Sequence, residues 1–141
     1  HREKLIPTII RSALDVSPIP IYGRGKNVRD WLYVADHCQG MDLVFHQGQA
    51  GQTYNIGGKN EWQNLEIARL ICRILDIKAP RNDGKSYAEQ ISFVQDRPGH
   101  DLRYAIDASK VESELGWQAM ETFQSGMEKT VDWLLAKYTA R

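Results

Sequence analysis

Two short segments concentrate the residues that could recognise a charged ligand. The first spans residues 20–34, Pro-Ile-Tyr-Gly-Arg-Gly-Lys-Asn-Val-Arg-Asp-Trp-Leu-Tyr-Val, and the second spans residues 96–104, Asp-Arg-Pro-Gly-His-Asp-Leu-Arg-Tyr. Each places an arginine, Arg29 or Arg97, beside rigid or tightly turning backbone. A guanidinium group donates hydrogen bonds in a planar fork that matches phosphate oxygens. The two arginines therefore predict a site that clamps a diphosphate.

A purely structural role for the same arginines stays open from the sequence alone. Each has carboxylates close by that would form ordinary ion pairs: Asp30 and Asp36 near the first, Asp96 and Asp101 near the second. Such pairs are common on protein surfaces and need no ligand.

Three further side chains are candidates for ligand contact. Tyr22 would stack on a base or bond to a ribose, although half-buried packing is the ordinary role of a strand tyrosine. Asn64 begins a predicted helix, where free backbone N–H groups favour anions and where an asparagine is also a plain N-cap. His100 would serve as an acid or base, a phosphate donor or a surface residue. The histidines show no metal-ligand spacing, so no metal site is expected.

Two further motif matches are rejected because the neighbouring residues do not suit the motif. Tyr22 and Lys26 have the spacing of a tyrosine activated by a lysine one helical turn away, but two glycines between them oppose a helix. Gly57-Gly58-Lys59 resembles the end of a phosphate loop but lacks the Ser or Thr that should follow. No Gly-x-x-Gly-x-x-Gly pattern follows a predicted strand, so no dinucleotide site is assigned to this chain.

The hydrophobic pattern predicts the elements that position these residues. Helices are expected at about 4–15, from Asp36 to just before Gly48, from Asn64 through Leu75, from Asp107 to Leu115, and from Thr122 onwards. Asp36, Asn64 and Asp107 are interpreted as N-caps. Strands are expected at 19–22, 28–34, 53–56 and 91–94. This mixed order predicts an α/β class in which some strands complete a sheet whose other strands lie outside this sequence.

Composition limits the class of partner and compartment. The 141 residues include 18 Lys and Arg and 18 Asp and Glu, so bulk charge draws the chain to neither nucleic acid nor a membrane surface. No apolar run approaches the roughly 20 residues of a membrane span. Cys38 and Cys72 fall on predicted apolar helix stripes, which predicts buried, reduced thiols and a cytoplasmic location. The length predicts one compact domain or a piece of one.

The motifs resemble those of the extended short-chain dehydrogenase/reductases that act on nucleotide sugars, and within that family those of the dTDP-glucose 4,6-dehydratases. The resemblance runs from about residue 4 into the C-terminal helix and is carried by Lys4–Pro7, Pro20–Tyr22, Arg29–Val34 with Asp36 and His37, Thr53–Gly58, Asn64 with Leu65, and Asp96–Asp101. The Arg29–Val34 block is shared by many nucleotide-sugar enzymes. Trp31-Leu32 within it and the Asp96–Asp101 segment indicate the dehydratases.

The resemblance implies a reaction in which bound NAD⁺ oxidises the glucose C4, a base removes the C5 proton, water leaves from C6 and the hydride returns to C6. In the family the NAD loop and the catalytic residues precede the region matched here. The resemblance therefore implies that residues 1–141 are a C-terminal nucleotide-sugar-binding domain. The N-terminal Rossmann domain and the catalytic residues would be absent, and the chain alone would be inactive.

The resemblance also implies which residues contact the nucleotide. The matching positions are Lys4, Leu5, Pro20, Ile21, Tyr22, Arg29, Asn64, Arg97 and His100. The two arginines would bind the diphosphate, Pro20–Tyr22 the thymidine side, and Asn64 a phosphate or ribose oxygen. The expected partners are a dTDP-sugar, the missing N-terminal half and a second copy of the chain, since Met41, Val44 and Phe45 would leave an apolar helix face exposed.

Two alternatives remain open from the sequence. One is another nucleotide-sugar dehydratase, decarboxylase or epimerase, which a panel of nucleotides would separate from a dTDP-sugar enzyme. The other is a non-catalytic nucleotide-binding or interaction module.

Overall fold

The computed structural model describes residues 3–139, which form two compact units. Unit 1 contains the described residues up to Asn27, then Gln63–Leu102, and those from Glu128 onwards. Unit 2 contains Val28–Trp62 and Arg103–Met127. His1, for which the sequence indicates no special role, lies outside the described residues.

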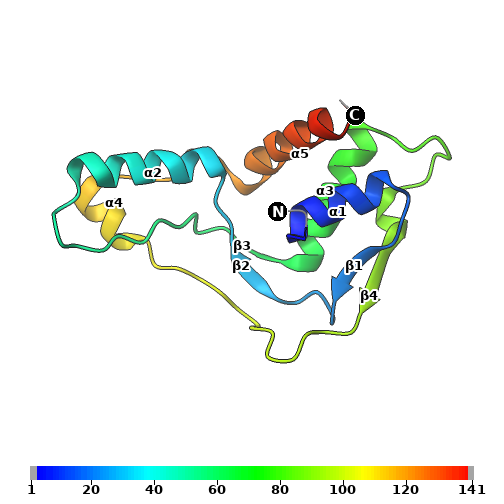
Figure 1. Ribbon diagram of the computed structural model, residues 1–141, viewed down its shortest axis with the longest axis horizontal. Helices are drawn as coiled ribbons and strands as arrows, with labels where there is room; N and C mark the ends of the chain where they lie inside the picture. The colour runs from blue at the N-terminus through cyan, green and yellow to red at the C-terminus, as the bar shows by residue number, and fades with distance from the viewer. Residues whose placement is uncertain (1–2, 140–141) are drawn as a thin grey trace. The chain divides into compact units, whose positions relative to one another are not determined.

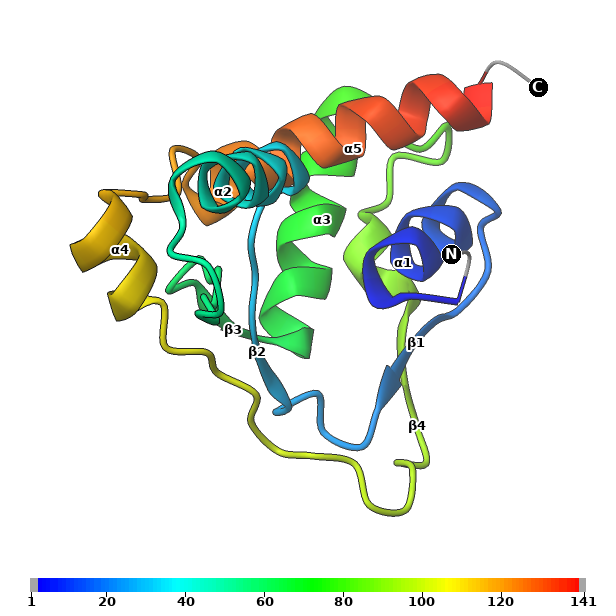
Figure 2. The same ribbon diagram turned by 60° about the vertical axis from the view of Figure 1, so that its left-hand side comes forward.

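Unit 1 is built around a parallel pair of strands and two packed helices. Strand β1 (Ile19–Tyr22) pairs with β4 (Ile91–Val94), with Ile19 opposite Ile91 and Tyr22 opposite Val94. Helix α1 (Leu5–Leu14) packs against α3 (Asn64–Lys78), and a short 3₁₀ helix, η1 (Tyr87–Gln90), leads into β4. Figures 1 and 2 both show β1 and β4 side by side. The fully buried core includes Ile9, Ile10, Ile19, Ile67, Ile71, Cys72, Leu75 and Val131.

Unit 2 consists of a second strand pair and two helices. Strand β2 (Val28–Asp30) neighbours β3 (Glu61–Gln63), whose last residue is assigned to unit 1. Helix α2 (Val34–Gln47) contacts α4 (Ser109–Leu115), and both views show them together. The core is the cluster of Ala108, Val111 and Trp117, with Leu32, Leu43, Val44, Tyr54 and Ile56 packed on it. Helix α5 (Phe123–Thr139) begins in this unit and continues in unit 1.

Helix α1 ends in an unusual way for its sequence. The Ser17 N–H donates to the Ser12 carbonyl at 2.9 Å and the Val16 N–H to the Ala13 carbonyl at 3.0 Å, which is the pattern of a Schellman motif. The residue in the left-handed position of that motif is Val16, at φ 51°. Glycine is the usual residue there, because a β-branched side chain is strained at positive φ.

The α/β class expected from the sequence is confirmed, with five α-helices and four strands among residues 3–139. The predicted helix at 4–15 and the strands at 19–22 and 91–94 are present within a residue of their expected bounds. Two strand predictions were wrong. The strand expected at 28–34 stops at Asp30, because the chain turns into α2 after Tyr33, and residues 53–56 form no strand.

Two of the predicted N-caps were wrong, because the helices begin at other residues. Helix α2 begins before Asp36, whose carboxylate is buried and accepts a hydrogen bond from the Glu121 N–H at 2.9 Å. Helix α3 is capped by Gln63 in a capping box with Glu66, so Asn64 is its first helical residue.

Asp107, which was also predicted as an N-cap, and Thr122, the predicted first residue of the last helix, do bond to their helices. The Asp107 carboxylate accepts from the Ser109 N–H at 2.9 Å, and the Thr122 hydroxyl accepts from the Ser125 N–H at 3.1 Å. Each side chain therefore satisfies one of the free donors at the start of α4 or α5.

The expected apolar stripe of α2 is largely on the surface. Cys38 is exposed, not buried as predicted, whereas Cys72 is buried as predicted. Met41 and Phe45 are 48% and 83% exposed, and only Val44 of the expected stripe packs on the unit 2 core. The exposure of Met41 and Phe45 agrees with the apolar face that was expected to be uncovered, whereas Cys38 was wrongly predicted as buried, because α2 directs Gly40 and Asp36 inward.

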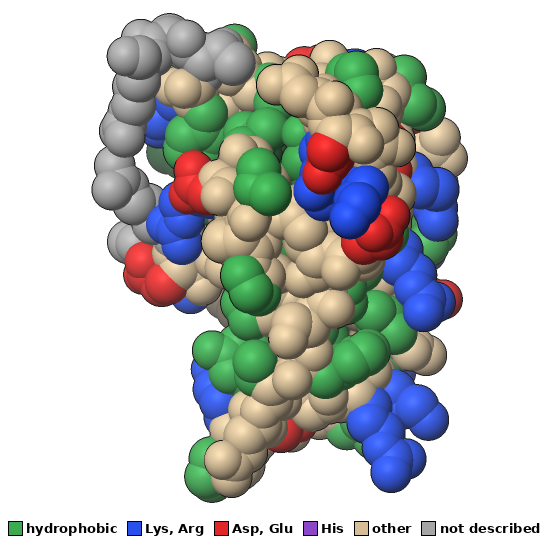
Figure 3. Space-filling model, turned by 90° about the vertical axis from the view of Figure 1, so that its right-hand side faces the viewer, with side chains coloured by type: hydrophobic (Ala, Val, Ile, Leu, Met, Phe, Trp, Pro, Cys, Tyr) green, Lys and Arg blue, Asp and Glu red, His purple; other side chains and the backbone are tan. Residues whose placement is uncertain are grey.

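Charge on the surface follows the balanced composition. On the face drawn in Figure 3, acidic and basic side chains lie beside each other among hydrophobic ones. None of the helices within residues 3–139 has the length and apolarity that crossing a membrane requires.

Candidate functional site

The loop between β1 and β2, residues 23–27, is the centre of the candidate site in unit 1. The Gly25 N–H donates to the Tyr22 carbonyl at 3.0 Å, which closes a tight turn directly after β1. Gly25 has φ 67°, and a Cβ there would lie 2.7 Å from Ile21 Cγ2 and 2.8 Å from Leu65 Cβ. Only glycine therefore allows the loop to approach the start of α3 this closely.

Backbone hydrogen bonds join this loop to the first turn of α3. The Asn64 N–H donates to the Asn27 carbonyl at 3.0 Å, and the Leu65 N–H donates to the Gly25 carbonyl at 3.0 Å. The buried Asn27 side chain also donates from Nδ2 to the Asp101 carbonyl at 3.1 Å. One loop thus links the end of β1, the start of α3 and the segment that follows β4.

The segment after β4 forms a turn that contains the exposed Arg97 and His100, whose side chain is only 7% exposed. The His100 N–H donates to the Arg97 carbonyl at 3.2 Å, with Pro98 and Gly99 between them and Gly99 at φ 68°. Proline followed by a positive-φ glycine is the signature of a type II turn. The sequence Arg-Pro-Gly-His therefore encodes the turn directly.

Asp96 holds this turn through its carboxylate. Its Oδ1 lies 2.6 Å from His100 Nδ1 and 2.8 Å from the Arg97 backbone N–H. The His100 hydrogen bond, followed by that of Arg97, holds the pKa of Asp96 below its ordinary value. The ion pair between Arg97 and Asp96 that the sequence left open is replaced by this arrangement. Within residues 3–139 the exposed Arg97 guanidinium makes no hydrogen bond or ion pair.

The other candidates in unit 1 differ in how accessible they are. Tyr22 is 44% exposed, and Pro20 is half-buried. The Ile21 side chain is 1% exposed, so a contact with a ligand would come from its backbone. Lys4 and Leu5 lie at the start of α1, and no hydrogen bond or ion pair joins them to the other candidates in the described part of the chain.

Arg29 belongs to unit 2, where its own surroundings fix it. The half-buried side chain donates from Nη1 to the Val28 carbonyl at 2.6 Å, and its Cζ lies 4.8 Å from the centroid of the Tyr104 ring. The carboxylate of Asp30 accepts hydrogen bonds from the backbone N–H groups of Gly58 and Asn60, at 3.0 and 2.7 Å.

Sequence reasoning missed two residues that organise these surroundings. Asn27 connects three segments but looks like an ordinary loop asparagine in the sequence. Tyr104 lies in the second charged segment, yet nothing in the spacing showed that it would meet Arg29. The buried side-chain amide and the contact with Arg29 both depend on segments that are distant in sequence.

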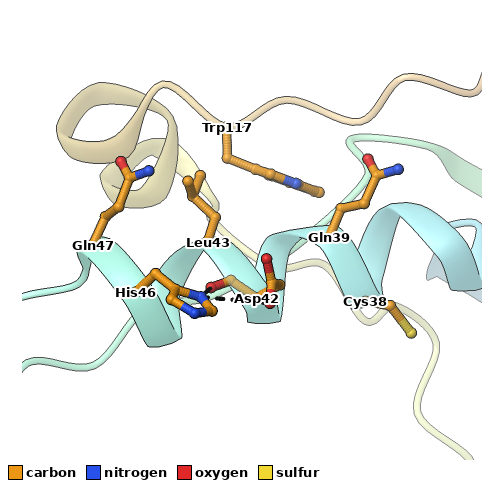
Figure 4. Close-up of a pocket in the computed structure, with 7 residues that line it drawn as sticks. All are labelled: Cys38, Gln39, Asp42, Leu43, His46, Gln47 and Trp117. Carbon is orange, nitrogen blue, oxygen red and sulfur yellow. Dashed lines mark hydrogen bonds and ion pairs between the residues drawn. The ribbon is translucent and has the colours of Figure 1, made fainter.

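A separate pocket of about 830 Å³ lies in unit 2 and contains none of the predicted residues. Figure 4 shows Trp117 above α2 with Leu43 directed toward it, while Cys38 points away. His46 Nδ1 lies 2.9 Å from the Asp42 carbonyl on the same helix. The described residues hold no group of three or more His, Cys, Asp or Glu side chains that would bind a metal.

Curated relatives match almost the whole of this chain. It is 54% identical to the dTDP-glucose 4,6-dehydratase of Xanthomonas campestris pv. campestris over 137 residues, which are 97% of this chain and 39% of the relative. It is 56% identical to the dTDP-glucose 4,6-dehydratase of Salmonella typhimurium over 134 residues, 95% of this chain and 37% of the relative. The chain thus spans about two fifths of the length of these relatives.

The fold matches a solved structure of the same description. The dTDP-glucose 4,6-dehydratase of Bacillus anthracis, in complex with NAD, superposes with a TM-score of 0.83 and 40% identity, covering 99% of this chain and 41% of that one. The sequence model of the family described as GDP-mannose 4,6 dehydratase matches residues 1–130. Because these residues are most of this chain, the chain belongs to the GDP-mannose 4,6 dehydratase family.

Proposed function

We propose that this chain is the nucleotide-sugar-binding part of a dTDP-glucose 4,6-dehydratase. The whole enzyme would use NAD to convert dTDP-glucose to dTDP-4-keto-6-deoxyglucose and water. The observation that carries the proposal is the loop at residues 23–27, which joins the end of β1, the start of α3 and the segment of Arg97 and His100. The high identity to enzymes of that description supports the choice of substrate.

The residues of unit 1 offer the chemistry that a nucleoside diphosphate needs. Arg97 would donate to phosphate oxygens, since its guanidinium is exposed beside a rigid turn. Asn64 would donate its side-chain amide to a phosphate or ribose oxygen, and the half-exposed Tyr22 ring would lie against the base. His100 uses Nδ1 for Asp96, so Nε2 is the nitrogen left to face a ligand.

The proposal assigns binding to this chain and leaves catalysis to other parts of the enzyme. A dinucleotide site needs a glycine-rich turn between a strand and a helix. Among residues 3–139, β3 passes into α3 without a turn, and the glycine-rich loop after β1 leads to β2. These residues do not fit NAD, so we place the cofactor outside them. Binding energy from the nucleotide would hold the sugar at the reacting centre.

A cytoplasmic location is part of the same proposal. Both cysteines, Cys38 and Cys72, are free thiols in the structure. Unpaired thiols fit a reducing compartment, where nucleotide sugars would be the available substrates.

Calorimetric titration of the chain with dTDP, UDP, CDP and GDP tests the proposed function. We expect dTDP to bind most tightly and Arg97→Ala to weaken it by about tenfold or more, since a hydrogen bond to a charged group contributes about 1.5–3 kcal/mol. Arg73→Ala, an exposed arginine on α3 outside the candidate site, is the matched control and should bind as the parent does.

Tightest binding of GDP would instead favour the substrate named in the family description. Equal affinity for all four nucleotides would contradict a dTDP-sugar site. A chain that binds none of them would be joined to the preceding part of a relative and titrated again. Failure of that longer protein to bind dTDP would also contradict the proposal.

A further inference from the structure

We infer that Asn27 is a positioning residue, which fixes where the turn at residues 97–100 lies relative to Asn64. This inference rests on the proposed function, because Asn64 and Arg97 of that turn are among the groups proposed to bind the nucleotide. All of these residues belong to unit 1. Asn27 itself is only 4% exposed, so it would act through the segments that it holds and not by touching the ligand.

The backbone of Asn27 holds the start of α3. Its carbonyl accepts a hydrogen bond from the Asn64 N–H at 3.0 Å, and the Gly25 carbonyl accepts one from the Leu65 N–H at 3.0 Å. These two N–H groups are among the donors that the first turn of a helix leaves free. Because the loop at residues 23–27 occupies both of them, the main chain of Asn64 is fixed, and its side-chain amide is left to meet a ligand.

The side chain of Asn27 holds the chain just beyond the turn. Its Nδ2 donates to the Asp101 carbonyl at 3.1 Å. Before the turn, at the end of β4, the Gly23 N–H donates to the Val94 carbonyl at 2.9 Å. The loop at residues 23–27 thus fastens the chain on both sides of the turn. A segment that is fastened at both ends samples fewer conformations than one that is held at a single end.

An asparagine suits this position because of the group that it bonds. A backbone carbonyl accepts hydrogen bonds, so its partner has to be a donor. Burying an amide is unfavourable unless it is paired, and its removal would take this donor away from the Asp101 carbonyl. An aspartate has almost the same shape, but its ionised carboxylate only accepts. Asn27→Asp therefore keeps the volume of the side chain and removes the hydrogen bond.

The anchoring of the turn has a consequence for affinity. Arg97 is exposed and begins the turn, so its guanidinium can meet phosphate oxygens only where the turn places it. Ordering a mobile loop on binding costs free energy, and a turn that is already fixed avoids that cost. We expect the effect on ligands that carry phosphate, because the thymidine side is assigned to Pro20–Tyr22 of β1.

The first measurement is NMR relaxation of the free chain, without any ligand. In Asn27→Asp we expect the backbone order parameters of Gly99 and His100 to fall from about 0.85, typical of rigid backbone, toward the flexible range below about 0.6. Asn27→Ala removes the same bond without adding a charge and should give the same change. Ile71, in the buried part of α3, should stay rigid. Unchanged values in the turn, or an equal fall at Ile71, would overturn the proposed anchoring.

The second measurement is calorimetric titration of the same variants with dTDP and with thymidine, which lacks phosphate. We expect both variants to weaken dTDP binding by roughly three- to tenfold and to leave thymidine binding unchanged. Gln90→Ala is the matched control. Its amide donates to the Ser17 carbonyl at 2.7 Å in the same unit, at the opposite end of β4 from the turn. An equal loss of dTDP affinity in Gln90→Ala, or parent-like binding by Asn27→Asp, would overturn the positioning role.

The Arg97→Ala background separates the inference from the proposed function. If Arg97→Ala weakens dTDP binding, Asn27→Ala should add little in that background, because it acts by placing Arg97. The full loss from Asn27→Ala in the absence of Arg97 would overturn the positioning role. If Arg97→Ala leaves dTDP binding unchanged, or if no form of the protein binds dTDP, the proposed function fails and the phosphate role of Asn27 falls with it. The order parameters then still decide whether Asn27 fixes the turn.

Discussion

At the scale of single residues, the hydrogen bond between Asp96 and His100 makes the stability of the turn at residues 97–100 depend on pH. The hydrogen bond with His100 holds the Asp96 pKa below its ordinary value of 3.8. Because the pKa is depressed in the folded chain, the stabilising contact is complete above that pH and is lost as the pH falls through the lower value. We expect the Asp96 carboxyl carbon to titrate below pH 3.8 by NMR, and His100→Ala to move its midpoint up toward 3.8.

Asp107 provides an internal control in the same spectra. Its pKa is also held down, chiefly by the Ser109 backbone N–H, and His100→Ala should leave its midpoint unchanged. An Asp96 midpoint that does not move in His100→Ala would show that the turn is not held by this contact.

The two thiols should differ sharply in reactivity. Burial raises the pKa of Cys72 to about 12, whereas Cys38 is exposed. The thiolate is the reactive form, so at pH 8 we expect a disulfide reagent such as DTNB to modify one thiol per chain rapidly. Cys38→Ser should abolish this fast phase, and Cys72 should react only after unfolding in urea. A fast phase that survives in Cys38→Ser would show that Cys72 is accessible.

At the scale of elements, the end of α1 carries strain that a single change should relieve. Val16 occupies the left-handed position of the Schellman motif at φ 51° and is 64% exposed, so its side chain contributes little packing. We expect Val16→Gly to stabilise the chain by about 1 kcal/mol, measured from urea unfolding curves. Val16→Ala keeps a Cβ and should gain less. A lower midpoint for Val16→Gly would mean that unfolded-state entropy outweighs the strain.

The sequence predicted correctly those elements whose apolar periodicity or turn residues lie within the element itself. Helices α1 and α3 have buried faces of helical period, and the Arg-Pro-Gly-His turn follows directly from its residues. Strands β2 and β3 are three residues each and owe their extended conformation to each other. No pattern within three residues reveals such a pair, which explains why one was predicted too long and the other was missed.

The candidate site follows the same rule. The types of Arg29, Arg97 and His100 indicate anion chemistry from the sequence alone. The roles of Asn27 and Tyr104 arise only when the chain brings segments more than seventy residues apart into hydrogen-bonding distance. A single sequence carries no signal for such contacts, because they depend on backbone register.

At the scale of the whole molecule, we propose that the chain associates with itself through α2. Val34, Met41 and Phe45 are 66%, 48% and 83% exposed, and with exposed Cys38 they are spaced by four, three and four residues. That spacing forms one narrow apolar stripe, the kind that pairs with another helix. We expect sedimentation velocity to show a concentration-dependent dimer.

Replacing Met41 and Phe45 with serine should weaken this dimer by at least about tenfold, since each exposed apolar side chain contributes on the order of 1 kcal/mol when buried. Ile77→Ser is the matched control, because Ile77 is 82% exposed on α3. A monomer at all concentrations, or equal weakening by Ile77→Ser, would exclude α2 as the contact.

The parallel pairing of β1 with β4 also sets an order of events during synthesis. Ile19 must wait for Ile91, and the buried Val131 and Leu134 of unit 1 leave the ribosome later still. Closing so long a loop is slow, because its entropy is lost before the distant contacts form. Helix α1 therefore leaves the ribosome well before β4 and α5, and Ile9 and Ile10 would be exposed to chaperones during that interval.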